Sequence, residues 1–154
     1  SLLRHPLAVS KISDFSQGTF EEVIDDTVNP KNVTKLVFCT GKFYYDLLAE
    51  RTKLESYNVA LIRIEQLFPL HLEKLQQIIT KYPNAEKYFW TQEEPENMGA
   101  WGFMLQRFKL VNLEVISQPF YAVPAAGSTA RFKRRHQRVI DKVFESNKKN
   151  NESK

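Results

Sequence analysis

Cysteine, glycine and long apolar runs are scarce in this sequence, and each scarcity excludes a class of function. The single cysteine, Cys39 of 154 residues, excludes an intramolecular disulfide and a CxxC metal or redox site. No apolar run approaches the roughly 18 to 20 residues of a membrane-spanning helix, and the first residues lack the pattern of a signal peptide. We therefore expect a soluble domain in a reducing compartment, with its one thiol buried in the apolar run LVFCT.

The motifs of nucleotide binding, metal binding and nucleophilic catalysis are missing as well. The segment CTGK, residues 39–42, has one glycine and matches neither GxGxxG nor GxxxxGKS. His5, His71 and His136 are far apart and have no carboxylate or histidine at metal-ligand spacing. No serine lies in a GxSxG turn, and Cys39 has no evident base. We expect no catalytic residue and no metal ligand in this chain.

Positive charge is concentrated at the C-terminal end. Residues 131–154 contain nine Lys or Arg and three acids, a local charge of +6, whereas the whole chain has a net charge of +4. Apolar residues recur at helical spacing within ARFKRRHQRVIDKVF, which predicts a helix with one packed face. No nucleic-acid recognition motif accompanies the charge, so we expect no nucleic-acid binding. The remaining interpretations are a solvated basic face and, through residues 131–138, docking to an acidic partner protein.

Short apolar runs alternate with segments of 3.6-residue periodicity along the rest of the chain. The runs predict strands, and the periodic segments predict helices of about 10 to 15 residues. The predicted strands are 33–40, 58–64, 85–92 and 113–118, and the predicted helices follow Gly41, cover 71–82, extend from about 97 to 109 and cover 129–146. This order predicts a three-layer α/β/α domain with a mostly parallel sheet of about five strands.

The same pattern divides the chain into three parts. Residues 1–32 are predicted to form an N-terminal linker or arm that packs on the domain, 33–146 the α/β domain, and 147–154 a disordered polar tail. The sequence opens on SLLRHPLAVS rather than on methionine, so we expect it to be part of a longer protein.

The carboxyl ends of parallel strands form the functional edge of such a sheet. That edge is predicted to carry the turn at Gly41 and Lys42, the acidic stretch after the third predicted strand, and the loop 118–128. We take Gly41, Lys42 and Arg51 as candidate residues of a ligand-binding rim. One hypothesis is therefore an independent regulatory module that binds a small molecule, a nucleotide or an acyl-CoA.

The stretch TQEEPENMGAWGFM, residues 91–104, holds the best candidate cluster of polar side chains at this edge. Its carboxylates, Glu93, Glu94 and Glu96, precede a predicted helix, where the helix dipole favours each acid by roughly 0.3 to 1 kcal/mol. The start of a helix therefore suffices to explain the composition. The alternative is that Glu93 or Glu94, at the end of a strand, faces a cofactor or a partner subunit.

Five segments follow one another in an order that resembles a known family. SLLRHPLAVS, CTGKFYYDLLAERTK, VALIRIEQLFPL, FWTQEEPENMGAW and VPAAGS together resemble the C-terminal domain of 2-oxoglutarate dehydrogenase, the thiamine-diphosphate-dependent decarboxylating component. The resemblance covers residues 1 to about 146. It implies a fold like the C-terminal domain of transketolase, placed at the dimer interface beside the thiamine-binding domains of the same chain.

The resemblance also implies what the parent enzyme does. That enzyme decarboxylates 2-oxoglutarate oxidatively and transfers a succinyl group to lipoyl groups of the succinyltransferase component, in the bacterial cytoplasm or the mitochondrial matrix. The family's catalytic histidines and its ligands for thiamine diphosphate and magnesium lie in upstream domains. The present chain alone is therefore expected to be inactive, and no role is assigned to His136. The residues expected to support a homodimer interface are Glu93, Glu94, Asn97, Gly99 and Trp101.

Overall fold

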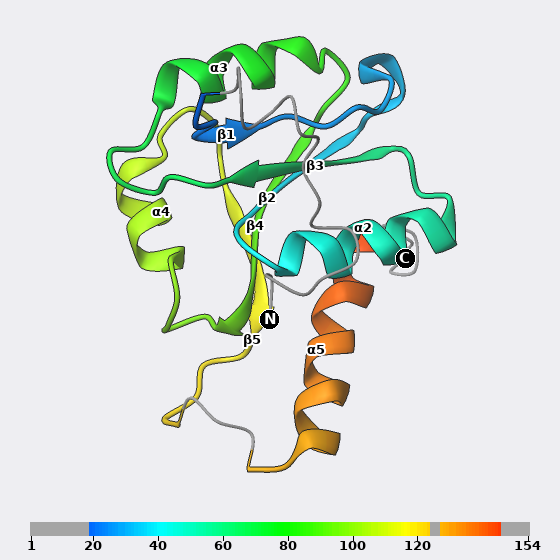
Figure 1. Ribbon diagram of the computed structural model, residues 1–154, viewed down its shortest axis with the longest axis vertical. Helices are drawn as coiled ribbons and strands as arrows, with labels where there is room; N and C mark the ends of the chain where they lie inside the picture. The colour runs from blue at the N-terminus through cyan, green and yellow to red at the C-terminus, as the bar shows by residue number, and fades with distance from the viewer. Residues whose placement is uncertain (1–18, 124–126, 146–154) are drawn as a thin grey trace, which may run out of the picture.

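The computed structural model describes residues 19–123 and 127–145, which form a five-stranded sheet between two pairs of helices (Figure 1). The strands are β1 (Val23–Ile24), β2 (Lys35–Cys39), β3 (Val59–Ile64), β4 (Lys87–Pro95) and β5 (Glu114–Gln118). The helices are α2 (Phe43–Leu54), α3 (Leu72–Lys81), α4 (Trp101–Arg107) and α5 (Thr129–Phe144), with a 3-10 helix over Pro30–Asn32. The predicted three-layer α/β fold, like that of a transketolase C-terminal domain, is confirmed.

The order of the strands in the sheet is β1-β3-β2-β4-β5. β2 pairs in parallel with both β3 and β4, and β4 pairs in parallel with β5. β1 runs antiparallel at the edge of β3, with Val23 opposite Ile64 and Ile24 opposite Arg63. The sequence did not predict β1, because two residues are too few to show the alternation of a strand.

Helices cover both faces of the sheet, as Figure 1 shows: α3 and α4 lie on one side, and α2 and α5 on the other. The first side buries Leu75, Ile78, Met104 and Phe108 against the sheet, and the second buries Phe43, Leu47, Val139 and Val143. Each large apolar side chain buried in this way contributes roughly 1.5 to 3 kcal/mol. Among the described residues, no helix combines the length and apolar composition that crossing a membrane requires.

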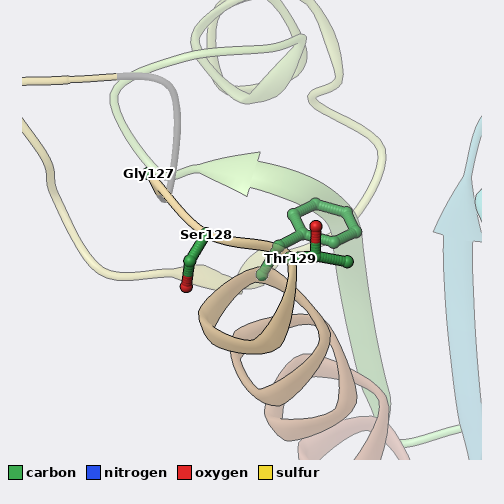
Figure 2. Close-up of a pocket in the computed structure, with 4 residues that line it drawn as sticks. Gly127, Ser128 and Thr129 are labelled. Atoms are coloured by element: carbon green, nitrogen blue, oxygen red, sulfur yellow. The ribbon is translucent and has the colours of Figure 1, made fainter.

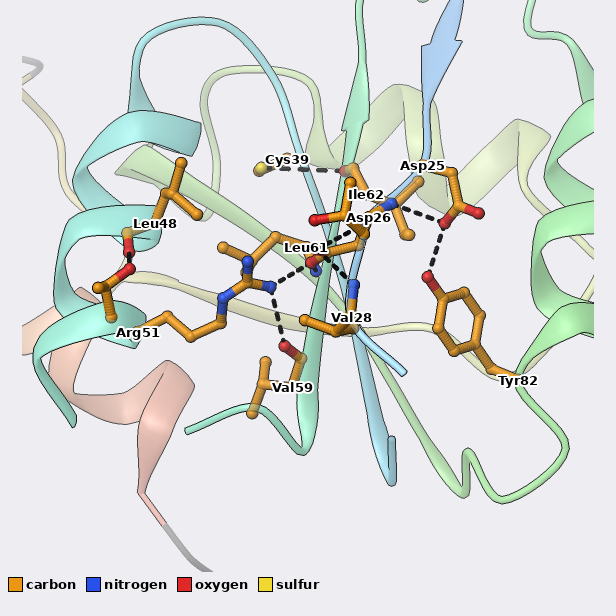
Figure 3. A network of polar contacts seen from close by, with 12 residues as sticks. Asp25, Asp26, Val28, Cys39, Leu48, Arg51, Val59, Leu61, Ile62 and Tyr82 are labelled. Carbon is orange, nitrogen blue, oxygen red and sulfur yellow. Dashed lines mark hydrogen bonds and ion pairs between the residues drawn. The ribbon is translucent and has the colours of Figure 1, made fainter. Parts of the chain in front are cut away.

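A buried ion pair attaches the segment after β1 to the domain (Figure 3). Asp26, 5% exposed, contacts the guanidinium of Arg51 in α2, 4% exposed. The Asp26 carboxylate also accepts hydrogen bonds from the backbone N–H groups of Thr27 and Leu61, at 2.7 and 2.6 Å. Arg51 donates to the carbonyl of Val59 at 3.2 Å. These contacts connect the N-terminal segment, α2 and β3.

The predicted division of the chain lies partly outside the described residues, which begin at residue 19 and end at 145. Residues 1–18 and the proposed tail at 147–154 are therefore not covered. Within the predicted arm, β1 joins the sheet and Asp26 contacts α2. The boundary at residue 33 stays a prediction.

Candidate functional site

The carboxyl ends of β2 and β4 form the candidate site. These two strands are neighbours, yet the chain leaves β2 toward the face covered by α2 and leaves β4 toward the face covered by α4. Parallel α/β sheets bind ligands at such points, where adjacent connections go to opposite faces. Lys42 lies three residues after the end of β2, and Glu93 belongs to the last part of β4, so both residues are brought to this point.

Lys42 is held by two carboxylates. Its Nζ lies 3.2 Å from Oε2 of Glu93 and 3.3 Å from Oδ2 of Asp46. Partial burial acts to lower the pKa of Lys42, but the charges and hydrogen bonds of Glu93 and Asp46 outweigh burial, and the pKa is raised. Because the ammonium is already neutralised, the geometry gives no support to Lys42 as a binding group for a ligand anion.

His136 of α5 completes this cluster. Its Nε2 lies 3.2 Å from Oδ2 of Asp46, and its buried Nδ1 lies 3.6 Å from Oε2 of Glu93, beyond hydrogen-bond distance. The imidazole contacts the ring edge of Phe43 and stacks on Phe132, with centroid distances of 5.2 and 5.5 Å. The cluster of Lys42, Asp46, Glu93 and His136 therefore joins α2, β4 and α5.

The sequence analysis gave His136 no role. Ninety positions separate it from Asp46, so linear spacing could not show their contact. A usable signal was its position: Phe132, His136 and Ile140 recur every four residues and share one face of α5. That face packs on α2 and the sheet, which places the imidazole inward.

The acidic stretch is not the start of a helix, which corrects the first interpretation of its composition. β4 continues through Pro95, and α4 begins only at Trp101, so Glu93 and Glu94 lie in an extended strand. The helix was expected to begin near Asn97. The helix dipole acts within the first turn and cannot account for acids six or more residues before it. The pairing of β4 with β5 shifts register between Thr91 and Pro95, where the strand bends toward the loop.

Gln92 is the residue that shapes this loop. Its amide nitrogen donates to the carbonyls of Pro95 and Met98, at 3.0 and 2.6 Å. Its amide oxygen accepts from Nε1 of Trp90 at 2.8 Å and from the backbone N–H of Trp101 at 3.0 Å. The side chain is buried, so these four bonds satisfy its whole amide. No sequence pattern had distinguished Gln92 from the polar residues around it.

Gly99 allows the chain to close around Gln92. Its φ is +64°, and a Cβ at this position would lie 2.9 Å from Nε2 of Gln92. The absence of a Cβ at Gly99 thus accommodates a side chain of the same chain. Trp101 is half-buried, and its backbone, rather than its ring, bonds to Gln92.

The loop is also tied to the chain after β5. Asn97 donates to the carbonyl of Tyr121 at 2.9 Å and accepts from its N–H at 3.1 Å. Gln118 donates to the carbonyl of Glu93 at 2.7 Å. Glu94, Glu96 and Asn97 remain exposed on this fixed loop, whereas the carboxylate of Glu93 turns inward to Lys42.

Two candidates of the ligand-binding rim lie in different places. Gly41 makes the turn between β2 and α2 with a φ of +58°, at the carboxyl edge as expected. Arg51 does not belong to this edge, and its assignment to the rim is corrected. It lies near the end of α2, where it is buried and pairs with Asp26 (Figure 3), so its guanidinium is inaccessible to a ligand.

An open hollow lies at the start of α5, beside the cluster. Gly127, Ser128, Thr129 and Phe132 line it, with a volume of about 390 Å³ (Figure 2). The Ser128 hydroxyl is used as the helix cap, accepting from the backbone N–H of Arg131 at 3.2 Å. Figure 2 shows the Ser128 and Thr129 side chains leaving the chain in different directions, so they do not converge on a common ligand atom.

The charged groups of the described segments do not form a metal site. Within residues 19–123 and 127–145, no group of three or more His, Cys, Asp or Glu side chains is placed to hold a metal ion. Lys42 occupies the space between the two carboxylates of the cluster. The arrangement orders the edge of the sheet.

Comparison with known proteins agrees with the order of the motifs. Residues 9–144 match the model of the family described as 2-oxoglutarate dehydrogenase C-terminal. The chain belongs to this family. The match includes the cluster, the loop shaped by Gln92 and the whole sheet.

Curated relatives include proteins named for 2-oxoadipate and proteins named for oxoglutarate. The chain is 41% identical over 150 residues to the mouse protein named 2-oxoadipate dehydrogenase complex component E1, covering 93% of this chain. It is 39% identical over 148 residues to the 2-oxoglutarate dehydrogenase E1 component of Haemophilus influenzae, covering 92%. In both cases the chain spans only 16% of the relative's length. A domain of an E1-type component is thereby identified.

Proposed function

We propose that the chain is the C-terminal domain of the E1 component of a 2-oxoglutarate dehydrogenase complex, and that its carboxyl edge contributes to the interface between two E1 subunits. In this proposal the parent enzyme decarboxylates 2-oxoglutarate oxidatively and transfers the succinyl group to lipoyl groups of the succinyltransferase component. It works in the bacterial cytoplasm or the mitochondrial matrix. Family membership and the fold support the assignment.

Exposed apolar side chains at the carboxyl edge carry the interface proposal. Phe68 follows β3 and is 78% exposed, and Phe120 follows β5 and is 74% exposed. The other exposed apolar residues from segments at this edge are Phe20, Leu72, Val123 and Phe132. Apolar surface concentrated in one region of a soluble domain typically marks an interaction site.

The acidic loop supplies the polar part of the same edge. Gln92 and Gly99 fix its backbone, so Glu94, Glu96 and Asn97 are presented in one conformation. A preorganised loop loses little conformational entropy when a partner binds. Glu93 acts from the inside, because its contacts with Lys42 hold the end of β4 against α2.

Thiamine diphosphate and magnesium enter this proposal through the other parts of the parent chain. Within the described residues no group of three or more His, Cys, Asp or Glu side chains is placed to hold a metal ion, and Lys42 of the cluster is already paired with two carboxylates. The domain supports the enzyme by shaping the dimer and is inactive by itself. A 2-oxoglutarate assay of the parent chain with and without residues 1–154 tests this role, and loss of dimer and activity together is the expected result.

A 2-oxoadipate dehydrogenase is the second candidate, because the mouse relative is as similar as the bacterial ones. The two substrates differ by one methylene, which a binding pocket discriminates by roughly 1 to 3 kcal/mol. We expect the full-length enzyme to have the higher kcat/KM for 2-oxoglutarate. A higher value for 2-oxoadipate would assign the second function and leave the interface proposal intact.

The interface is tested in the full-length enzyme by the double variant Phe68→Ser/Phe120→Ser. We expect the dissociation constant of the dimer to rise by about tenfold or more, since each buried aromatic anchor contributes at least 1 to 2 kcal/mol. Light scattering over a dilution series measures the dissociation constant, and circular dichroism checks that the variant is folded.

The matched control is Leu54→Ser/Tyr57→Ser, at the opposite end of the sheet. Both residues are 49% exposed, against 78% and 74% for the test pair, so the change removes a smaller exposed apolar surface, away from the carboxyl edge. This variant should dissociate like the unmodified enzyme. If the dissociation constant of the dimer rises equally in both double variants, or in neither of them, the carboxyl edge is not part of the interface.

A further inference from the structure

Four cations form a stripe along α5. Arg131, Arg135, Arg138 and Lys142 are spaced by four, three and four residues, which places them on one side of the helix. This side of α5 lies next to β5. Arg135, Arg138 and Lys142 line a groove of about 250 Å³ together with Ser117, Gln118 and Tyr121.

The charge of this stripe is not compensated within the described part of the chain. None of the four cations has a carboxylate within ion-pair distance there, although Lys42, Arg51, Lys53, Arg63, Lys74 and Lys81 all do. Arg135 has a different partner, since its guanidinium lies over the ring of Tyr121 at 4.2 Å. Like charges at this spacing repel one another along a helix, so binding of an anion is favoured.

The other wall of the groove is an edge strand. β5 pairs with β4 only, at the end of the strand order. The carbonyls of Ile116 and Gln118 are occupied by Thr91 and Glu96, from β4 and the loop that follows it. The opposite edge of β5 has no neighbouring strand among the described residues, and an open edge accepts an extended peptide as an added strand.

We propose that the groove between β5 and α5 binds an extended acidic segment of a partner protein. The backbone of the segment pairs with the free edge of β5, and acids at alternate positions face the cations of α5. Side chains on one face of a strand repeat about every 6.7 Å, and the cations repeat on average about every 5.5 Å along the helix axis. Flexible Arg and Lys side chains absorb this difference.

A protein segment fits this groove better than a nucleic acid. Single-stranded nucleic acids are held largely by bases stacked on aromatic rings. Tyr121, the one aromatic residue lining the groove, already has Arg135 over its ring. The free edge of β5 offers backbone pairing, which a peptide uses and a nucleic acid does not. The inference stands independently of the proposed dimer interface.

Two fluorescein-labelled nine-residue peptides test the proposal on the purified full-length protein, with fluorescence anisotropy as the readout. One alternates Thr and Glu, and the other has Gln in place of each Glu. We expect the Glu peptide to bind about tenfold tighter or more at low salt, and its affinity to fall as salt rises. Equal affinity for the two peptides would overturn the proposal.

The variant Arg138→Glu/Lys142→Glu locates the site. It should weaken binding of the Glu peptide by about tenfold or more, with Arg138→Gln/Lys142→Gln intermediate. The control Lys133→Glu/Arg134→Glu makes the same change in net charge on α5 outside the stripe, and should weaken binding by less than about threefold. Equal weakening by the two Glu variants would show non-specific attraction and overturn the proposal.

Backbone pairing and ligand class are tested with two further probes. Two Glu peptides carry N-methyl groups on alternate amides, one on the odd-numbered and one on the even-numbered residues. At least one of them should bind about tenfold more weakly than the unmethylated peptide, because methylation removes the N–H donors that pair with a strand. Unchanged affinity of both methylated peptides would exclude strand addition. A nine-nucleotide oligothymidylate should bind more weakly than the Glu peptide, and tighter binding that depends on Arg138 and Lys142 would assign the groove to nucleic acid instead.

Discussion

Gln92 shows how one buried side chain can determine the course of a loop. Four backbone and side-chain groups from Trp90, Pro95, Met98 and Trp101 depend on its amide for their hydrogen bonds. Buried polar groups are costly when they lose such partners. The conformation of the acidic loop therefore depends on a residue that carries no charge and is not itself part of the surface.

Replacing Gln92 by Leu should destabilise the domain by about 2 to 4 kcal/mol, because the buried indole N–H and carbonyl groups lose their partners. Urea unfolding of the purified 154-residue chain measures the change. Gln77→Leu is the matched control, since Gln77 is exposed on α3, and should cost less than about 0.5 kcal/mol. A Gln92→Leu effect as small as that of the control would show that water replaces the amide.

Gly99→Ala should cost more than Gly41→Ala, although both glycines have positive φ. The left-handed conformation costs a non-glycine residue roughly 1 to 2 kcal/mol at either position. At Gly41 a Cβ meets nothing within 4 Å, whereas at Gly99 it lies 2.9 Å from Nε2 of Gln92. Thermal unfolding of both variants should give a larger loss for Gly99→Ala, by about 1 kcal/mol or more. Equal losses would mean that Gln92 moves aside freely.

At the scale of elements, β1 is a strand of only two residues whose position depends on the ion pair beside it. Two ladder positions give little stability of their own. The pair between Asp26 and Arg51 fixes the chain that follows β1 to α2, and the bond from Leu61 to Asp26 fixes it to β3. These side-chain contacts thus add to the backbone bonds that hold this edge of the sheet.

Arg51→Met should destabilise the chain by about 3 to 5 kcal/mol, because it leaves the Asp26 carboxylate buried without its cation. Lys53→Met, two residues later on α2, removes an exposed ion pair with Glu50 and should cost less than about 1 kcal/mol. Urea unfolding gives both values. The double variant Asp26→Leu/Arg51→Met should cost less than the sum of the two single changes, and strict additivity would show that the two residues do not interact.

The sequence predicted the strands that contain short apolar runs and missed the features that depend on single contacts. β2 and β3 appeared close to their predicted places because most of their buried residues are consecutive. β5 was also found close to its predicted place, although its two buried residues are separated by a partly buried one. β1 was too short to recognise. α4 was expected to begin near Asn97, since acids before an apolar run are typical of a helix start. The residues before Trp101 instead form a loop whose conformation depends on Gln92 and Gly99.

The candidate site was predicted in part. Lys42 and Glu93 were both placed at the carboxyl edge, because parallel strands bring their ends together. Their contact with each other and with His136 depends on how α5 packs on α2, and no spacing along the chain encodes that packing. Arg51 was misplaced because a charged residue in a helix is usually exposed.

At the scale of the whole molecule, groups buried in a neutral form link stability to alkaline pH. Burial raises the pKa of the Cys39 thiol, and burial with a hydrogen bond to Asp25 raises the pKa of Tyr82. Burial also raises the pKa of Tyr44. It lowers the pKa of Lys35, and this shift changes the pH dependence of stability in the opposite direction. The acids outnumber the base, so the folded state retains more protons than the unfolded chain at high pH.

The free energy of unfolding should therefore fall as the pH rises above about 9. The unfolded chain releases its thiol proton near 9.0, while the folded chain retains it, and each such group changes stability by up to about 1.4 kcal/mol per pH unit. Urea unfolding at intervals from pH 7 to 11 measures the trend. In the variant Cys39→Ala the decline in the free energy of unfolding should begin nearer pH 10, which is the ordinary pKa of tyrosine. An unchanged onset would show that Cys39 does not control it.

The two edges of the sheet also bear on aggregation. Open edge strands are where β-proteins join one another into insoluble aggregates, and short strands or nearby lysines and arginines counteract this. One edge here is the two-residue β1, and the other is β5 with a row of cations beside it. The charges beside β5 should therefore repel a second copy of this edge as well as attract an acidic segment.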